Sequence, residues 1–157
     1  MDLQKVNFEK AIDAKILDKK LSGLKWITKI YPNNPKKEIL RLQEAINIIN
    51  KDNRKKIIAT DYQVISVILS SYDYSPNKYW GELHAYPEKG HKYFEIYRNF
   101  FISKLKENKI EIVYIIKPLW GGDDVLKSVL NENCLEKKVI TDILESQLLL
   151  KCEDLEN

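Results

Sequence analysis

The stretch Lys55-Lys56-Ile57-Ile58-Ala59-Thr60-Asp61-Tyr62-Gln63 decides the fold of this chain. It is a short apolar run that stops at Thr-Asp, and a second apolar segment, Val64 to Leu69, follows at once. Further along, the run Ile110 to Ile116 repeats the pattern and ends in Lys117-Pro118-Leu119-Trp120-Gly121-Gly122-Asp123. Short runs rich in β-branched residues, separated by helical sequence, are typical of parallel strands in an α/β sheet.

The segments around these runs show helical and strand periodicity. Apolar residues recur every three or four positions after Pro35 and again from Lys92 to Asn108, and each of these patterns predicts an amphipathic helix. Shorter helices are expected at Tyr62–Ser71 and Asp124–Leu130. The pattern at Leu24–Thr28 predicts a strand, Lys137–Leu144 fits either a helix or a strand, and Gln147–Lys151 reads as a last strand at a sheet edge.

The order of these segments predicts an α/β fold. We expect a three-layer sandwich with a mostly parallel, Rossmann-like sheet of about four strands and helices on both faces. Its 157 residues suit a single domain, residues 1–157, large enough to bury a core. If Ile57 and Ile112 lie in adjacent parallel strands, the segments that follow them meet at one rim, where ligands gather in open α/β sheets.

Polar and aromatic residues follow the strands at this predicted rim. The candidate ligand-binding residues are Asp61, Tyr62, Tyr74, Tyr79, Trp80, Trp120, Gly121, Gly122 and Asp123. Asp61 either caps the next helix or lines a site. The aromatic residues of the loop 72–80 either cover an edge of the core or offer flat faces to a sugar, a base or a protein. The Gly-Gly turn allows close approach to a phosphate, but Asp123 disfavours an anion there.

Composition and missing motifs exclude several classes of function. The net charge of +3 is mild and the Lys and Glu residues are interspersed, so nucleic acid is not an expected partner. The two histidines, His84 and His91, lack the spacing of a metal site, and no phosphate loop, dinucleotide fingerprint or serine nucleophile elbow occurs. We therefore expect no metal, no cofactor and no catalytic residue in this chain.

The cysteines, Cys134 and Cys152, leave two possibilities open. Two thiols cannot close a structural zinc site by themselves. They form either a disulfide or a pair of buried thiols, and the choice depends on the compartment, which the spacing does not reveal.

Four segments together resemble a known family. They are residues 21–28 (LSGLKWIT), 31–39 (YPNNPKKEI), 59–66 (ATDYQVIS) and 114–120 (YIIKPLW). In this order they resemble the C-terminal soluble portion of bacterial polytopic glycosyltransferases of the GT-C type, the dolichyl-phosphate-mannose or aminoarabinose transferase-like group. The catalytic acidic residues of that family lie in loops between membrane helices, which this sequence lacks. No catalytic residue can therefore be carried over.

The resemblance implies an accessory or recognition domain cut from a larger membrane protein. It would lie on the extracytoplasmic face of the bacterial inner membrane, where an oxidising environment favours a disulfide between Cys134 and Cys152. Its partners would be the membrane-embedded part of its own parent protein and a glycan or lipid-linked sugar. Two alternatives stay open: a cytoplasmic α/β enzyme for a small phosphorylated or nucleotide-like substrate, and a protein-interaction module.

Overall fold

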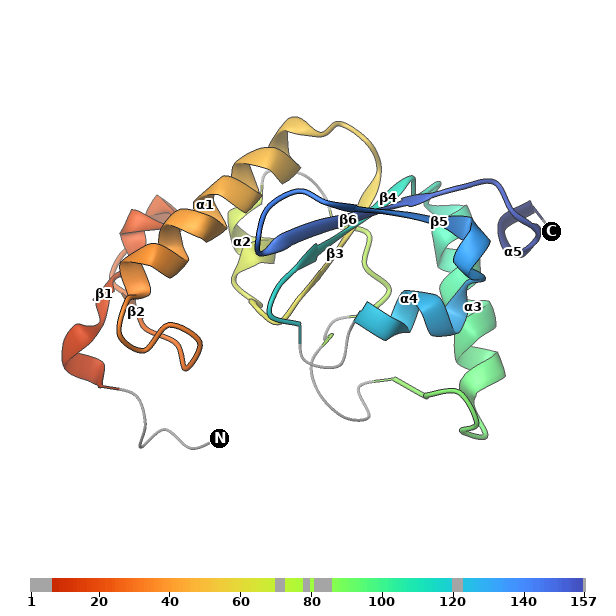
Figure 1. Ribbon diagram of the computed structural model, residues 1–157, viewed down its shortest axis with the longest axis horizontal. Helices are drawn as coiled ribbons and strands as arrows, with labels where there is room; N and C mark the ends of the chain where they lie inside the picture. The colour runs from red at the N-terminus through yellow and green to blue at the C-terminus, as the bar shows by residue number, and fades with distance from the viewer. Residues whose placement is uncertain (1–6, 70–72, 78–79, 81–85, 120–122, 157) are drawn as a thin grey trace.

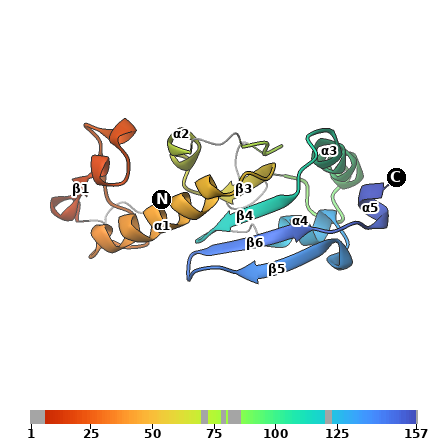
Figure 2. The same cartoon turned by 90° about the horizontal axis from the view of Figure 1, so that it is seen from above.

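A four-stranded mixed sheet forms the centre of the molecule (Figure 1). The computed structural model describes residues 7–69, 73–77, 80, 86–119 and 123–156. The strand order is β3-β4-β6-β5, which Figure 2 shows face on. These strands are β3 (Lys56–Thr60), β4 (Ile112–Ile116), β6 (Leu144–Leu149) and β5 (Leu135–Val139).

The two decisive apolar runs are adjacent and parallel, as the sequence predicted. Ile57 pairs with Val113 and Thr60 with Ile116, so both strands end level with one another at the same edge of the sheet. β6 then pairs antiparallel with β4, and β5 pairs antiparallel with β6. Since one of these three pairings is parallel, the prediction of a mostly parallel, Rossmann-like sheet is wrong.

A tight hairpin between β5 and β6 explains why these two strands of the sheet are antiparallel. Four residues connect β5 to β6, and the backbone amides of Ile140 and Thr141 both donate to the carbonyl of Leu144. A parallel connection needs a crossover of a dozen or more residues, which this segment does not have. Of the strand expected at Gln147–Lys151 at a sheet edge, residues 147–149 therefore belong to β6 inside the sheet, and β5 occupies the edge.

The observed helices and remaining strands agree with the predicted ones to different extents. The long helices α1 and α3 confirm two predictions, and α4 begins one residue earlier than expected. The strand expected at Leu24–Thr28 shortens to two residues that pair with another two-residue strand. These elements are β1 (Ile12–Asp13), β2 (Lys25–Trp26), α1 (Pro35–Lys51), α2 (Ile65–Ile68), α3 (Phe94–Glu107), α4 (Asp123–Val129), α5 (Glu153–Glu156) and the 3₁₀ turns η2 (Phe8–Lys10), η3 (Ala14–Ile16), η4 (Lys19–Leu21) and η5 (Glu132–Cys134). Within the described ranges, no helix has the length and apolar character needed to cross a membrane.

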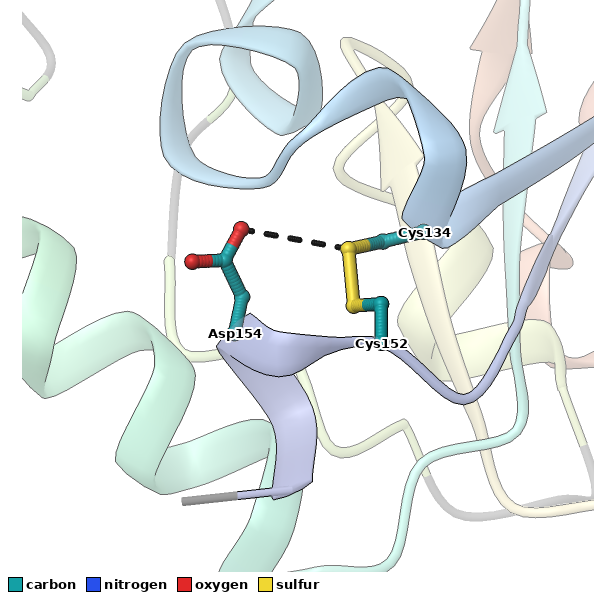
Figure 3. A group of neighbouring side chains, drawn as sticks. All are labelled: Cys134, Cys152 and Asp154. Atoms are coloured by element: carbon teal, nitrogen blue, oxygen red, sulfur yellow. Dashed lines mark hydrogen bonds between the residues drawn. A yellow bond between two sulfur atoms is a disulfide. The ribbon is translucent and has the colours of Figure 1, made fainter.

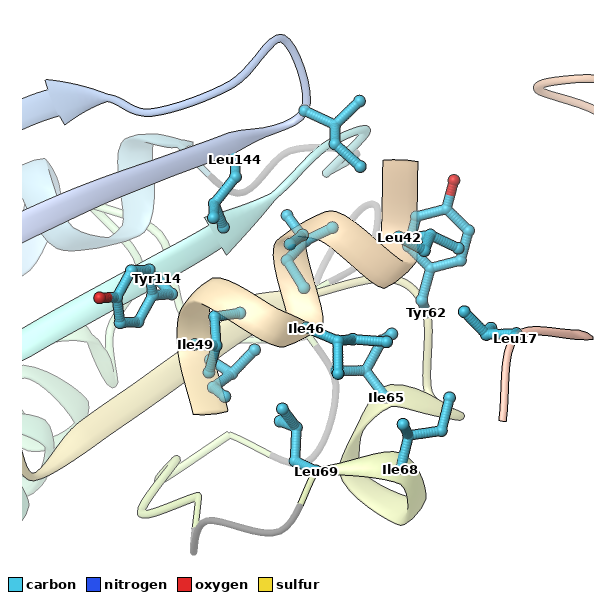
Figure 4. Close-up of a cluster of buried hydrophobic side chains, with 14 of the residues drawn as sticks. Leu17, Leu42, Ile46, Ile49, Tyr62, Ile65, Ile68, Leu69, Tyr114 and Leu144 are labelled. Carbon is cyan, nitrogen blue, oxygen red and sulfur yellow. The ribbon is translucent and has the colours of Figure 1, made fainter. Parts of the chain in front are cut away.

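Alternating residues of the sheet feed two separate cores. Ile58 and Tyr114 point into a cluster with α1 and α2, where Ile49 and Ile65 are fully buried (Figure 4). The neighbouring strand residues face the opposite way and pack against α3 and α4. That second cluster contains Ile57, Val113, Phe101, Leu126 and Trp80. The period of two along β3 and β4 therefore gives this sheet a core on each face.

Candidate functional site

A pocket of about 260 Å³ lies beside β3, the edge strand at one side of the sheet. Two of the predicted site residues, Tyr62 and Trp80, are in its lining. The described residues that line it are Ile58, Thr60, Tyr62, Gln63, Ile65, Ser66, Leu69, Asp73, Ser75, Asn77 and Trp80. The lining thus combines hydroxyl, amide and carboxyl groups with a few apolar side chains.

Asp73 anchors one wall of this pocket to the strand. It forms an isolated parallel bridge with Lys56, and the Tyr74 amide donates to the Lys56 carbonyl at 3.2 Å. The Asp73 Oδ1 accepts the backbone N–H of Ile58 at 3.1 Å and that of Ser75 at 3.0 Å. Burial raises the pKa of Asp73, and these two N–H groups offset part of that rise. Asp73 was not predicted as a site residue.

Trp80 belongs both to the second core and to the lining of the pocket. Its side chain is 2% exposed and meets the ring of Phe101 edge to face, with the centroids 6.2 Å apart. The indole N–H donates to the Ser75 Oγ at 3.0 Å, and both residues line the pocket. Tyr74 is half-buried, and the Lys55 Nζ lies 5.8 Å from its ring centroid. Tyr79 lies outside the described residues.

Tyr62 connects the pocket to a buried carboxyl group. Its hydroxyl donates to the Glu38 Oε1 at 2.7 Å. Glu38 is 1% exposed and also accepts the Thr28 hydroxyl and the Trp26 indole N–H, both at 2.8 Å. Burial, followed by the bond to Glu38, raises the pKa of Tyr62 far above its ordinary value. The four side chains join β2, the loop after it, α1 and the segment after β3.

The sequence did not predict the role of Glu38. This glutamate lies in the first turn of α1, where it interacts favourably with the helix dipole, and Asn34 caps the helix by accepting from the Lys37 amide at 3.1 Å. The three donors come from residues 10 to 24 positions away, so no local pattern links them to this carboxylate. Trp26 and Tyr62 additionally stack with their ring centroids 6.2 Å apart.

Asp61 does not cap the following helix, so the capping alternative for this residue is wrong. α2 begins at Ile65, and its N-cap residue, Val64, makes no side-chain capping bond. The chain turns first, because the Tyr62 amide bonds to the Thr60 Oγ1 at 3.1 Å and the Gln63 amide to the Asp61 carbonyl at 3.0 Å. That turn directs the Tyr62 side chain inward to its carboxylate partner, and Asp61 is not among the residues that line the pocket.

The segment that leaves β4 borders a different pocket. Lys117, Pro118 and Leu119 line a hollow of about 370 Å³ together with Tyr31 and Ile143. Trp120, Gly121 and Gly122 lie outside the described residues, and Asp123 is the first residue of α4. The described parts of the predicted rim are therefore divided between two hollows, although the two strands do end at the same edge.

A charge cluster around one buried carboxylate lies at this end of β4. Glu145 of β6 is buried and its carboxylate bonds to the Lys117 ammonium, while the Lys137 Nζ lies 2.8 Å from its Oε2. Burial alone would raise the pKa of Glu145, but the two lysines outweigh it and the net shift is downward. Since both ammonium groups share one carboxylate, this cluster ties β4, β5 and β6 together.

A disulfide joins Cys134 to Cys152 (Figure 3), the pairing that the resemblance implied. The Cys134 Sγ also lies 3.8 Å from the Asp154 Oδ2. A disulfide sulfur carries no proton, so this is a contact and not a donated hydrogen bond. The two sulfurs and a carboxylate oxygen lie within 4.8 Å of one another, but the sulfurs are bonded and Asp154 accepts from Arg98 and Asn131. With the disulfide formed, these three side chains are therefore not arranged as a metal site.

Comparison of the chain with protein-family models, with curated proteins and with solved structures finds no match. The pocket beside β3, the Glu38 cluster and the disulfide are therefore interpreted from their own geometry.

Proposed function

We propose that this chain is an extracytoplasmic accessory domain of a membrane glycosyltransferase-like protein. It recognises a neutral, hydroxyl-rich ligand such as a sugar unit in the pocket beside β3, and it carries out no chemistry of its own. The parent protein and the glycan partner are inferred from the sequence resemblance described above. The ligand class is inferred from the lining of the pocket, and the compartment from the disulfide.

The lining of the pocket is the observation that carries this proposal. Its described residues include one carboxylate, Asp73, together with the hydroxyl and amide groups of Thr60, Ser66 and Gln63, and they include no lysine or arginine. Sites for phosphate rely on cations or on the N-termini of longer helices; the helix at this pocket, α2, has four residues, and its Ile65 amide already bonds to the Tyr62 carbonyl. A carboxylate repels phosphate but accepts a hydrogen bond from a sugar hydroxyl. The lining thus favours a neutral sugar over a phosphorylated or nucleotide-like ligand.

The disulfide supports an extracytoplasmic location. Disulfides persist in the periplasm and outside cells, and they are rare in the reducing cytosol. The Cys134–Cys152 bond is thus consistent with a domain on the outer side of the bacterial inner membrane. It is less consistent with the alternative of a cytoplasmic enzyme.

A matched pair of ligands tests the pocket. Glucose and glucose 1-phosphate differ only in the phosphate group, and a wider panel adds mannose, arabinose and N-acetylglucosamine. We expect at least one neutral sugar to shift the backbone amide resonances of Thr60, Ser66 and Ser75 with a dissociation constant of about 1 mM, which corresponds to about 4 kcal/mol. Asp73→Asn should weaken that binding by about tenfold, because a hydrogen bond to a charged acceptor is lost.

The control for this substitution is Glu44→Gln, which makes the same chemical change at an exposed position of α1 and should leave binding unchanged. Tighter binding of glucose 1-phosphate than of glucose at the same amides would contradict the proposed ligand class and favour the enzyme alternative. If no sugar in the panel shifts these amides, the proposed recognition function is wrong.

The native gene tests the proposed parent protein. We expect its reading frame to extend beyond this sequence into segments of roughly 20 apolar residues each, the length that spans a bilayer. An antibody raised against this chain should then detect a protein much larger than 18.5 kDa in the membrane fraction of the native cells. Detection of an 18.5 kDa protein in the cytosolic fraction alone would overturn the assignment to a membrane protein.

A further inference from the structure

Helix α3 carries a row of apolar side chains on its solvent face. Tyr93, which precedes the helix, and Ile96 and Phe100 within it are 51%, 69% and 45% exposed. Their spacing of three and four residues places them on one side of the helix. Phe94, Phe101 and Leu105 lie on the opposite side, where they are buried in the core. The exposed row is therefore a second apolar face and not an extension of the packed one.

The exposed row is accompanied by positive charge. The Lys92 Nζ lies 4.7 Å from the centroid of the Tyr93 ring, and the Lys104 Nζ lies 6.0 Å from that of Phe100. Residues 88–109 contain six basic and three acidic side chains. The segment that bears the exposed row is thus net positive.

We infer that this surface, the α3 face, docks against an anionic membrane surface. We define the α3 face as Tyr93, Ile96 and Phe100 with Lys92 and Lys104. Aromatic and aliphatic side chains can enter the boundary between headgroups and acyl chains, while the flanking lysines keep their ammonium groups at the anionic headgroups. Figure 1 shows α3, with α5 beside it, at the end of the molecule opposite β1.

A protein partner fits the α3 face less well. The cores of protein–protein interfaces are depleted in lysine, whereas on the α3 face lysine ammonium groups lie over the aromatic rings. Lys104 is paired with Glu107 at 2.6 Å, so this pair is neutral and Lys92 supplies the net positive charge of the face. The inferred contact concerns the outer side of α3 and is independent of the pocket beside β3.

Flotation with lipid vesicles tests this inference on the full chain. We expect the protein to float with vesicles of equal parts phosphatidylglycerol and phosphatidylcholine and to stay unbound with pure phosphatidylcholine. The double substitution Ile96→Ser, Phe100→Ser should lower the partition coefficient by about tenfold or more, since two apolar side chains no longer leave water. Lys92→Gln should lower it by about fivefold, the effect of one lysine near an anionic surface.

Matched controls lie on α1. Leu40→Ser removes an apolar side chain that is 55% exposed, and Lys36→Gln removes an exposed lysine; neither should change flotation. Circular dichroism spectra that match the wild type would show that the variants are folded. The inference is overturned if the wild type binds neither vesicle, or if the controls lose as much binding as the α3 variants. It is also overturned if the α3 variants instead abolish a concentration-dependent dimer seen by sedimentation, because the face would then be a protein interface.

Discussion

Replacing Glu38 by alanine should lower the free energy of unfolding by about 3–5 kcal/mol, because one buried and two partly buried donors lose their shared acceptor at once. The Trp26 indole N–H, the Thr28 hydroxyl and the Tyr62 hydroxyl all bond to this one carboxylate. A loss of this size is a large share of the ordinary stability of a small domain. Urea denaturation, followed by Trp fluorescence and by far-UV circular dichroism, measures it directly.

Three comparison variants separate the hydrogen bonds from the change of side-chain size. Glu44→Ala shortens an exposed glutamate of the same helix and should change stability by less than about 0.5 kcal/mol. Tyr62→Phe removes one donor and should cost about 1 kcal/mol. Glu38→Gln keeps the size but sets an NH₂ group against one of the donors, so its loss should fall between those of Tyr62→Phe and Glu38→Ala. Equal stability of Glu38→Ala and Glu44→Ala would mean that the cluster contributes nothing.

The elements that the sequence predicted well are those with a strong local period. β3 and β4 are continuous runs of β-branched and apolar residues, and their residues point alternately into the two cores. The stripe of Ile39, Leu42, Ile46 and Ile49 marks α1 in the same way, and these four residues are buried. A local pattern therefore sufficed for the parallel pair and for both long helices.

The β5–β6 hairpin, which adds the antiparallel pairings to the sheet, has no strong local period in its sequence. The exposed edge strand β5 reads Leu-Glu-Lys-Lys-Val, and its last four residues face solvent. Its partner β6 carries Glu145, Ser146 and Gln147 in buried positions, where a sequence pattern leads one to expect apolar residues. The Glu145 carboxylate is accommodated by one lysine of β5 and by Lys117, which follows β4, a tertiary arrangement with no trace in the local sequence. Charged residues at an edge strand protect it from pairing with other chains.

The candidate site was predictable only in part, for the same reason. Tyr62 and Trp80 were selected because aromatic residues follow a strand end, and both do line the pocket. Asp73 was missed because its importance depends on the return of the chain along the free edge of β3, which brings its carboxyl group to the Ile58 amide. A turn at Thr60–Gln63 replaced the predicted helix start, since the bond between Tyr62 and Glu38 fixes the chain there.

Removing the disulfide by Cys134→Ala together with Cys152→Ala should lower the free energy of unfolding by about 3 kcal/mol. The bond spans 18 residues, and a loop of that size restricts the unfolded chain by roughly this amount in the chain-entropy model. Cys134 precedes β5 and Cys152 follows β6, so the bond closes the open end of the hairpin. Beside it, the Leu150 amide donates to the Cys134 carbonyl at 2.9 Å.

Loss of the bond should also loosen the C-terminal helix. Asp154 of α5 accepts from the Arg98 Nη2 at 2.6 Å and from the Asn131 amide at 2.9 Å, and it lies two residues beyond Cys152. We therefore expect faster amide hydrogen exchange in α5 of the double variant than in the wild type, with β3 and β4 less affected.

Urea titrations of the wild type and of the double variant, each with and without dithiothreitol, separate the covalent bond from the cost of the substitutions. Dithiothreitol should destabilise the wild type by about the same 3 kcal/mol and leave the variant unchanged, because only the wild type has a bond to reduce. If the reductant has no effect on the wild type under conditions where thiol titration shows two free thiols, then the bond does not stabilise the fold. The case for an oxidising compartment would then lose its main structural support, since a domain equally stable with free thiols is also suited to the cytosol.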